Sequence, residues 1–133
     1  MAIFFEGTYD ETLDLLVEAR DYLMELEPLG RRGLGTEERL VLNCEAFRIT
    51  SRLTQIMAWL LIQKAVHAGE LTRRDAAAEE HRLSGHSVCL ANDLPPVSLP
   101  TSFVSLLDRS YRLYTRVERL DALVGLEGLA EAS

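Results

Sequence analysis

The sequence of 133 residues lacks the features that mark several classes of protein. It has only two cysteines, Cys44 and Cys89, and no Cys-x-x-Cys pair, so neither a disulfide framework nor a common zinc-site spacing is present. Its longest unbroken apolar run, from Ile56 to Ile62, is far shorter than the ~20 residues that span a bilayer. The opening residues lack the basic segment and cleavage site of a secretory signal peptide. We therefore expect a cytoplasmic protein with no membrane partner.

Positive charge is also scarce, because 14 Lys and Arg face 21 Asp and Glu for a net charge of −7. This balance argues against a nucleic-acid partner, since Lys and Arg must replace the counterions of the phosphate backbone. The sequence contains no P-loop, no G-x-G-x-x-G, no G-x-S-x-G and no pair of Glu-x-x-His motifs. These absences predict no cofactor, no catalytic residues and no enzyme activity.

What the sequence does contain is helical periodicity. A hydrophobic fraction of 47% excludes disorder, and the length fits one domain, residues 1–133. No stretch alternates with the period of two that a β-strand requires. Long helices are predicted at 9–27, 37–68 and 102–124, and a short helix at 72–83. We therefore predict an all-α fold, a small antiparallel helical bundle of three long helices plus one short helix.

Local signals set the expected helix ends. Thr8 and Glu11 have the spacing of a capping box, as do Thr72 and Asp75. Pro28 should stop the first helix and Gly69 the second. Loops are expected at 28–35 and at 85–100, and the second contains Pro95, Pro96 and Pro100. Gly125 and Gly128 should end the last helix and leave residues 125–133 as a short flexible tail.

Charge is unevenly distributed along the chain. Residues 1–30 carry eight acids and only one base, whereas residues 31–68 carry six bases and three acids. The helices predicted at 9–27 and 37–68 should therefore pack antiparallel with complementary charges along their edges.

The run from Ile56 to Ile62 is apolar on every side of a helix, so it must be covered all round. One interpretation is a homodimer whose interface includes residues of this run. The alternative is that the short helix and the segment Val88–Leu90 cover it within one chain. The predicted interface residues are Ile56, Met57, Trp59, Leu60 and Leu61.

Four arginines in the last helix are spaced by three, four and three residues and so share one face. They could bind an acidic partner segment through bidentate guanidinium contacts. The alternative is a solvated face balanced by nearby acids, those of the first helix included. The four residues are Arg109, Arg112, Arg116 and Arg119.

A small helical metal protein is a further hypothesis. His81, His86 and Cys89 are close in sequence and, with Cys44, could supply ligands. Their spacing matches no established zinc pattern, and small buried cysteines with hydrogen-bonded histidines explain the same residues. We therefore predict no metal ligands.

Several stretches, in order, resemble the regulator of CtrA degradation family of alphaproteobacteria. They are Phe5–Glu11, Leu16–Leu23, Asn43–Leu53, Gln55–Leu61, Ala65–Glu70 and His81–Leu83. The resemblance implies a dimeric helical bundle that acts as a non-catalytic adaptor. Such adaptors help deliver cell-cycle transcription regulators to the ClpX unfoldase and its ClpP protease, together with a single-domain response regulator. Many relatives are known only as proteins of unknown function, and the alternative role is a regulatory scaffold with no link to a protease.

Overall fold

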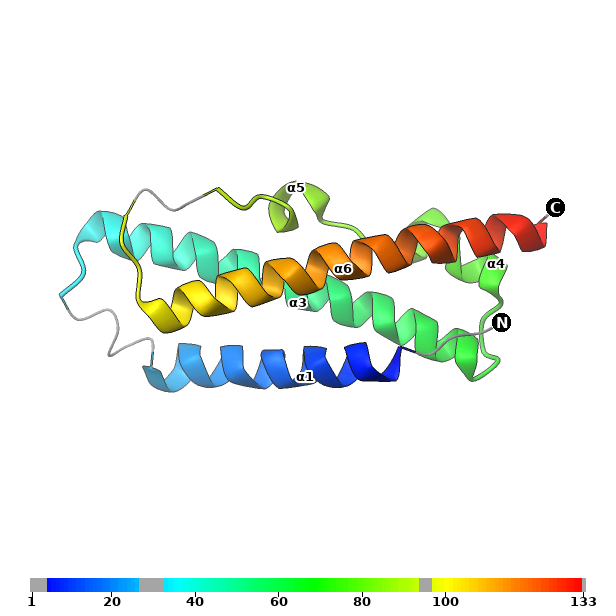
Figure 1. Ribbon diagram of the computed structural model, residues 1–133, viewed down its shortest axis with the longest axis horizontal. Helices are drawn as coiled ribbons and strands as arrows, with labels where there is room; N and C mark the ends of the chain where they lie inside the picture. The colour runs from blue at the N-terminus through cyan, green and yellow to red at the C-terminus, as the bar shows by residue number, and fades with distance from the viewer. Residues whose placement is uncertain (1–4, 27–32, 94–96, 133) are drawn as a thin grey trace.

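The computed structural model describes residues 5–26, 33–93 and 97–132, without the side chains of 25, 26, 131 and 132. These ranges contain helices and no strand, which confirms the predicted all-α bundle. Three long helices lie side by side: α1 (Glu6–Asp21), α3 (Thr36–His67) and α6 (Thr101–Ala132) (Figure 1). α1 runs antiparallel to both neighbours, whereas α3 and α6 point in the same direction (Figure 1).

The first helix begins earlier than its sequence predicts. Phe5 is the residue before α1, and Thr8 already lies inside the helix, where its carbonyl accepts a bond from the Thr12 hydroxyl at 2.7 Å. The predicted capping box of Thr8 and Glu11 is therefore wrong. After Asp21 the chain continues as a π-helical turn, η1 (Tyr22–Leu26). The predicted stop at Pro28 lies outside the described residues, as does most of the loop predicted at 28–35.

The second long helix matches its prediction. α3 ends at His67, and Gly69 has the positive φ of 80° that favours glycine after a helix. At 1.5 Å per residue the 32 residues of α3 span about 48 Å, whereas the 16 residues of α1 span about 24 Å. α3 therefore extends well beyond α1, and α6, of equal length, packs along it (Figure 1).

A long connection returns the chain to the start of α6. It contains α4 (Arg73–Ala76), the 3₁₀ turn η2 (Glu79–His81) and α5 (His86–Cys89). The Thr72–Asp75 capping box is confirmed by two reciprocal bonds of 3.0 Å. The predicted helix at 72–83 is wrong after Ala76, and α5 occupies part of the predicted irregular stretch 85–100. Pro95 and Pro96 lie outside the described residues.

The last helix does not end at its glycines. α6 continues to Ala132, so the predicted end near Val124 and the flexible tail at 125–132 are wrong; Ser133 lies outside the described residues. A Cβ on Gly128 would lie 2.2 Å from the Ala77 Cβ and 2.9 Å from the Arg73 carbonyl oxygen. The glycine therefore permits α4 to pack closely against α6, and it is a packing residue rather than a helix terminator.

The core forms where α1, α3 and α6 meet, and it contains a charged residue. Arg52 of α3 is completely buried. Its Nε donates to the Cys89 carbonyl at 2.8 Å and its Nη2 to the Ala91 carbonyl at 2.8 Å. Its Nη1 donates to the Leu107 carbonyl at 2.9 Å and to the Ser110 hydroxyl at 3.1 Å. One guanidinium thus joins α3, the end of α5 and α6.

Replacing Arg52 with Met should lower the free energy of unfolding by about 1–3 kcal/mol, because it leaves buried carbonyls without donors. Urea titration followed by the fluorescence of Trp59, the only tryptophan, measures the loss. Arg48→Met is the matched control. Arg48 also donates to the α5 region, at 3.1 Å to the Val88 carbonyl, but its side chain is partly exposed. Equal losses in the two variants would contradict the role given to Arg52.

Replacing Gly128 with Ala should destabilise the fold by about 1–3 kcal/mol, because the added methyl overlaps Ala77 and the Arg73 backbone. This cost opposes the gain of ~1 kcal/mol that alanine normally brings to a helix. Gly7→Ala in α1 is the control, since nothing lies within 4 Å of a Cβ there. Thermal unfolding of both variants should show a lower Tm for Gly128→Ala only. A higher Tm for that variant would show that α4 does not pack against α6 as described.

Candidate partner-binding site

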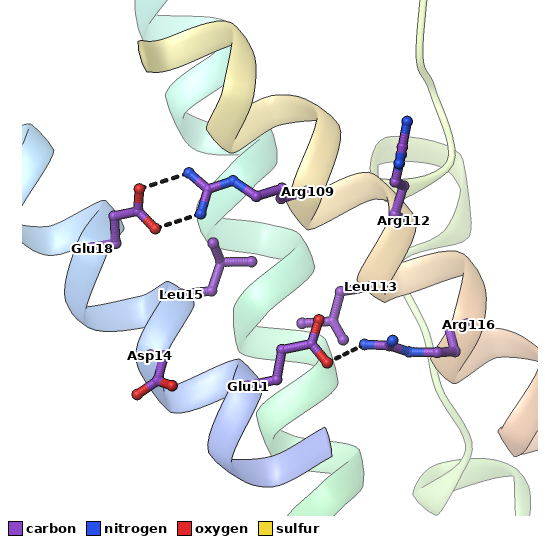
Figure 2. Close-up of a pocket in the computed structure, with 8 residues that line it drawn as sticks. All are labelled: Glu11, Asp14, Leu15, Glu18, Arg109, Arg112, Leu113 and Arg116. Atoms are coloured by element: carbon purple, nitrogen blue, oxygen red, sulfur yellow. Dashed lines mark hydrogen bonds and ion pairs between the residues drawn. The ribbon is translucent and has the colours of Figure 1, made fainter. Parts of the chain in front are cut away.

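The four arginines predicted to bind a partner all lie on the exposed surface of α6, and part of their row faces α1 (Figure 2). α1 presents acids at matching intervals, because Glu11, Asp14 and Glu18 are spaced by three and four residues. Since the two helices run antiparallel, the acid row and the arginine row meet in opposite order (Figures 1 and 2).

Two ion pairs link these rows. Arg109 donates from both terminal nitrogens to the two carboxylate oxygens of Glu18, each at 2.6 Å, and Arg116 pairs with Glu11. α1 and α3 pack antiparallel as predicted, but these acids of α1 meet α6 rather than α3. Two of the four arginines are thus balanced by the first helix, as the alternative interpretation allowed.

The other two arginines remain accessible. Arg112 pairs within its own helix with Asp108 at 3.1 Å, yet its side chain is 78% exposed. Figure 2 shows its guanidinium directed away from α1. Arg119 lies one turn of α6 beyond Arg116 and is exposed. These two side chains are the members of the row that can bind an added acidic group without breaking an ion pair to α1.

A hollow of about 290 Å³ lies along the α1–α6 boundary, with the two ion pairs on its walls (Figure 2). Its apolar base is formed by Leu15 and Leu113, both buried. Asp14 and Arg112 also line it. An apolar base with charged walls of both signs suits a protein segment that carries an apolar side chain between polar ones.

The Arg109–Glu18 pair alters the titration of both groups. The hydrogen bonds from Arg109 hold the pKa of Glu18 below its usual value of 4.5, and the same bonds raise the pKa of Arg109. Both side chains are nevertheless nearly half exposed, so the pair fixes the relation of α1 to α6 more than it adds stability.

The predicted dimer interface falls mostly inside one chain. Ile56, Trp59 and Leu60 are buried in the monomer core. The Trp59 ring stacks on Phe5 with centroids 5.3 Å apart, and its Nε1 donates to Asp121 of α6 at 2.9 Å. These three side chains therefore require no second copy to cover them, which corrects their assignment to an intermolecular surface.

Only part of that predicted interface stays accessible. Leu61 is 49% exposed and Met57 is partly buried. The homodimer itself stays a prediction, restricted to surfaces outside the core.

The residues of the metal hypothesis do not form one cluster. Cys89 is buried, and burial raises the pKa of its thiol, whereas Cys44 is exposed. His81 contacts the Asp75 carbonyl oxygen at 2.7 Å, and His86 lies 3.5 Å from the Glu118 carboxylate. Within the described ranges, no three His, Cys, Asp or Glu side chains gather closely enough to hold a metal ion.

Two buried charged residues that organise this region were not anticipated. Asp121 accepts bonds on one oxygen from Trp59 and from the Arg82 Nε, each at 2.9 Å, and so joins α3, α6 and the connection between them. The second is Arg52. The sequence did contain a signal for the burial of Arg52, because Arg52 follows Ile49 by three residues and precedes Ile56 by four. A charge within an apolar helical stripe indicates a buried polar contact.

Comparison with known proteins identifies the family of the chain. Residues 1–132 match the family described as protein of unknown function, DUF1465. The chain belongs to this family. It is also similar to RcdA from Caulobacter crescentus CB15, whose crystal structure aligns over 95% of this chain and 94% of that one, with 32% identity and a TM-score of 0.75. The resemblance to the regulator of CtrA degradation family is thereby confirmed. No curated protein matches the chain.

Among the helices of the described residues, none is long and apolar enough to cross a membrane.

Replacing Glu18 with Gln should lower the free energy of unfolding by up to about 1 kcal/mol near pH 7, because an exposed pair contributes little. Since the folded-state pKa of Glu18 is depressed, its contribution is full above pH 4.5 and is lost as pH falls through the folded value. Urea titrations over a pH series should therefore show the wild-type and variant curves converging in acid. Glu127→Gln, at an exposed position of α6, is the matched control for the loss of one carboxylate. A constant difference at all pH values would contradict the assignment.

Proposed function

We propose that the chain is a non-catalytic adaptor in regulated proteolysis, which helps deliver a cell-cycle transcription regulator to the ClpXP protease in the cytoplasm. The observation that carries this proposal is the similarity to RcdA over nearly the full length of both chains, at 32% identity. A match of this extent includes the three long helices and the connection between α3 and α6, and hence the surfaces through which an adaptor would act.

The charged boundary of α1 and α6 supports a binding role. An adaptor needs faces that hold two proteins at once, and it needs no reacting group. Arg112 and Arg119 offer accessible guanidinium groups beside a hollow with an apolar base. Such groups form bidentate bonds with carboxylates, so they suit an acidic segment of the unfoldase, the response regulator or the client. The proposed assembly also includes a homodimer through a surface outside the monomer core.

The decisive experiment is a reconstituted degradation assay with ClpX, ClpP, the single-domain response regulator and the client transcription regulator from the same organism. Addition of this chain should increase the rate at which full-length client disappears. The double variant Arg112→Glu/Arg119→Glu should lose most of that increase, about tenfold, because like charges now face the acidic partner. Arg39→Glu, an exposed arginine at the start of α3, is the matched control and should retain it.

Three outcomes separate the hypotheses. Stimulation of client degradation that is lost only in the Arg112→Glu/Arg119→Glu variant supports both the adaptor function and the arginine row as the binding site. Stimulation that survives in all variants keeps the function and removes these arginines from the site. No stimulation, with the response regulator and client present, contradicts the adaptor proposal and leaves the regulatory scaffold as the interpretation of the fold.

A further inference from the structure

We infer that α1 uses its outer face to bind a basic, amphipathic helical segment of a partner protein. The α1 outer face is defined by three exposed apolar residues and three flanking acids, Leu13, Val17, Met24, Asp10, Asp14 and Asp21. This inference deepens the proposed adaptor function by giving the chemistry of one partner, and its test below requires no protease.

The apolar residues form one stripe. Leu13 and Val17 are four residues apart, and Met24 follows Val17 by seven, so the three lie on one side of α1 and its continuation η1. Arg20, whose side chain is 63% exposed and pairs with Asp21, lies between Val17 and Met24 on the same side. They are 39%, 46% and 72% exposed. The opposite side of α1, with Leu15 and Ala19, is the side buried against α3 and α6. A surface helix normally exposes polar residues there, so three exposed apolar side chains on this side favour contact with another apolar face.

A second hollow adjoins this stripe. It has a volume of about 320 Å³ and lies between α1 and the start of α6. Its base includes the buried side chains of Tyr22 and Leu106, and Val17 stands at its edge. The hollow shares Asp14 and Glu18 with the one beside the arginine row, so the two hollows adjoin each other along α1.

Charge decides what kind of segment fits. The residues that line this second hollow in the described part of the chain include three carboxylates, Asp14, Glu18 and Asp21, and no basic side chain. Glu18 is neutralised by Arg109, and Asp21 pairs with Arg20 of its own helix at 3.0 Å. The Asp14 carboxylate makes no ion pair or hydrogen bond with the described residues. An arriving Lys or Arg could therefore bind Asp14 while the neighbouring apolar side chains cover Val17.

The same acidic residues disfavour the other molecules that could bind to the α1 outer face. An anionic membrane surface and a nucleic acid would both be repelled by the acids that flank the stripe. A second copy would bring the same acids to this face, so like charges oppose self-association through it, whereas they attract a cationic partner. A helix of complementary pattern, with apolar residues every three or four positions and Lys or Arg beside them, matches both the stripe and its flanks.

The test uses a labelled synthetic peptide of about 18 residues, or five helical turns, with Leu on one face and Lys on its flanks. Fluorescence anisotropy at low salt should show binding to the full chain, and a peptide with Glu in place of each Lys should bind at least about tenfold more weakly. The double variant Asp14→Lys/Val17→Ala should weaken binding of the basic peptide to a similar extent. The matched control is Glu70→Lys/Leu126→Ala, which makes the same change of charge and a similar loss of apolar surface at exposed positions elsewhere. Circular dichroism and Trp59 fluorescence verify that both double variants are folded.

Each outcome decides the inference. Selective loss in the α1 variant supports it, even if the degradation assay fails, because binding is measured without a protease. Equal loss in both double variants, or equal affinity for the acidic peptide, overturns it. Analytical ultracentrifugation of the chain alone tests whether a second copy binds to this face. Self-association that the α1 variant abolishes would show that it does, and would overturn the inference.

Discussion

The buried guanidinium of Arg52 sets the relation among most of the other elements. Its acceptors belong to the end of α5, to the chain just after it and to α6, which are 37 to 58 residues away in sequence. Because a buried charge is stable only when its hydrogen bonds are satisfied, the return segment must pass close to α3. Burial lowers the pKa of Arg52, but the ring of Tyr111, 5.2 Å away, and the surrounding carbonyl dipoles favour the cation.

The proposed binding surface follows from this internal arrangement. With α6 held against α3, its arginines reach the acidic side of α1, and two ion pairs close the boundary between the helices. The pairing leaves Arg112 on one wall and Asp14 on the other without a partner across the hollow. A depression with an apolar base and walls of opposite charge results. In the proposed adaptor role, its two charged edges would contact protein segments of opposite sign.

The similarity to RcdA has a simple physical meaning in this context. Two chains that share 32% of their residues over nearly their full length preserve the same helical framework. Within that framework the buried contacts of Trp59, Asp121 and Arg82 tie α3, α6 and the connection together. Solvent-exposed positions are free of this constraint, so the stripe of Leu13 and Val17 belongs to the part of the molecule in which binding can be tuned without loss of the fold.

The sequence by itself determined the helices and some of their ends, because periodicity, the Thr72–Asp75 capping box and Gly69 act over a few neighbouring residues. It also supplied the arginine row and the resemblance to the family. Only the tertiary structure decided that Gly128 packs against α4, that Trp59 is covered within one chain and that Glu18 meets Arg109. Each of these contacts joins residues more than 50 positions apart, or depends on how closely two helices approach. The local sequence pattern carries no information about the distance between two helices, because that distance is set by the packing of all the side chains between the helices.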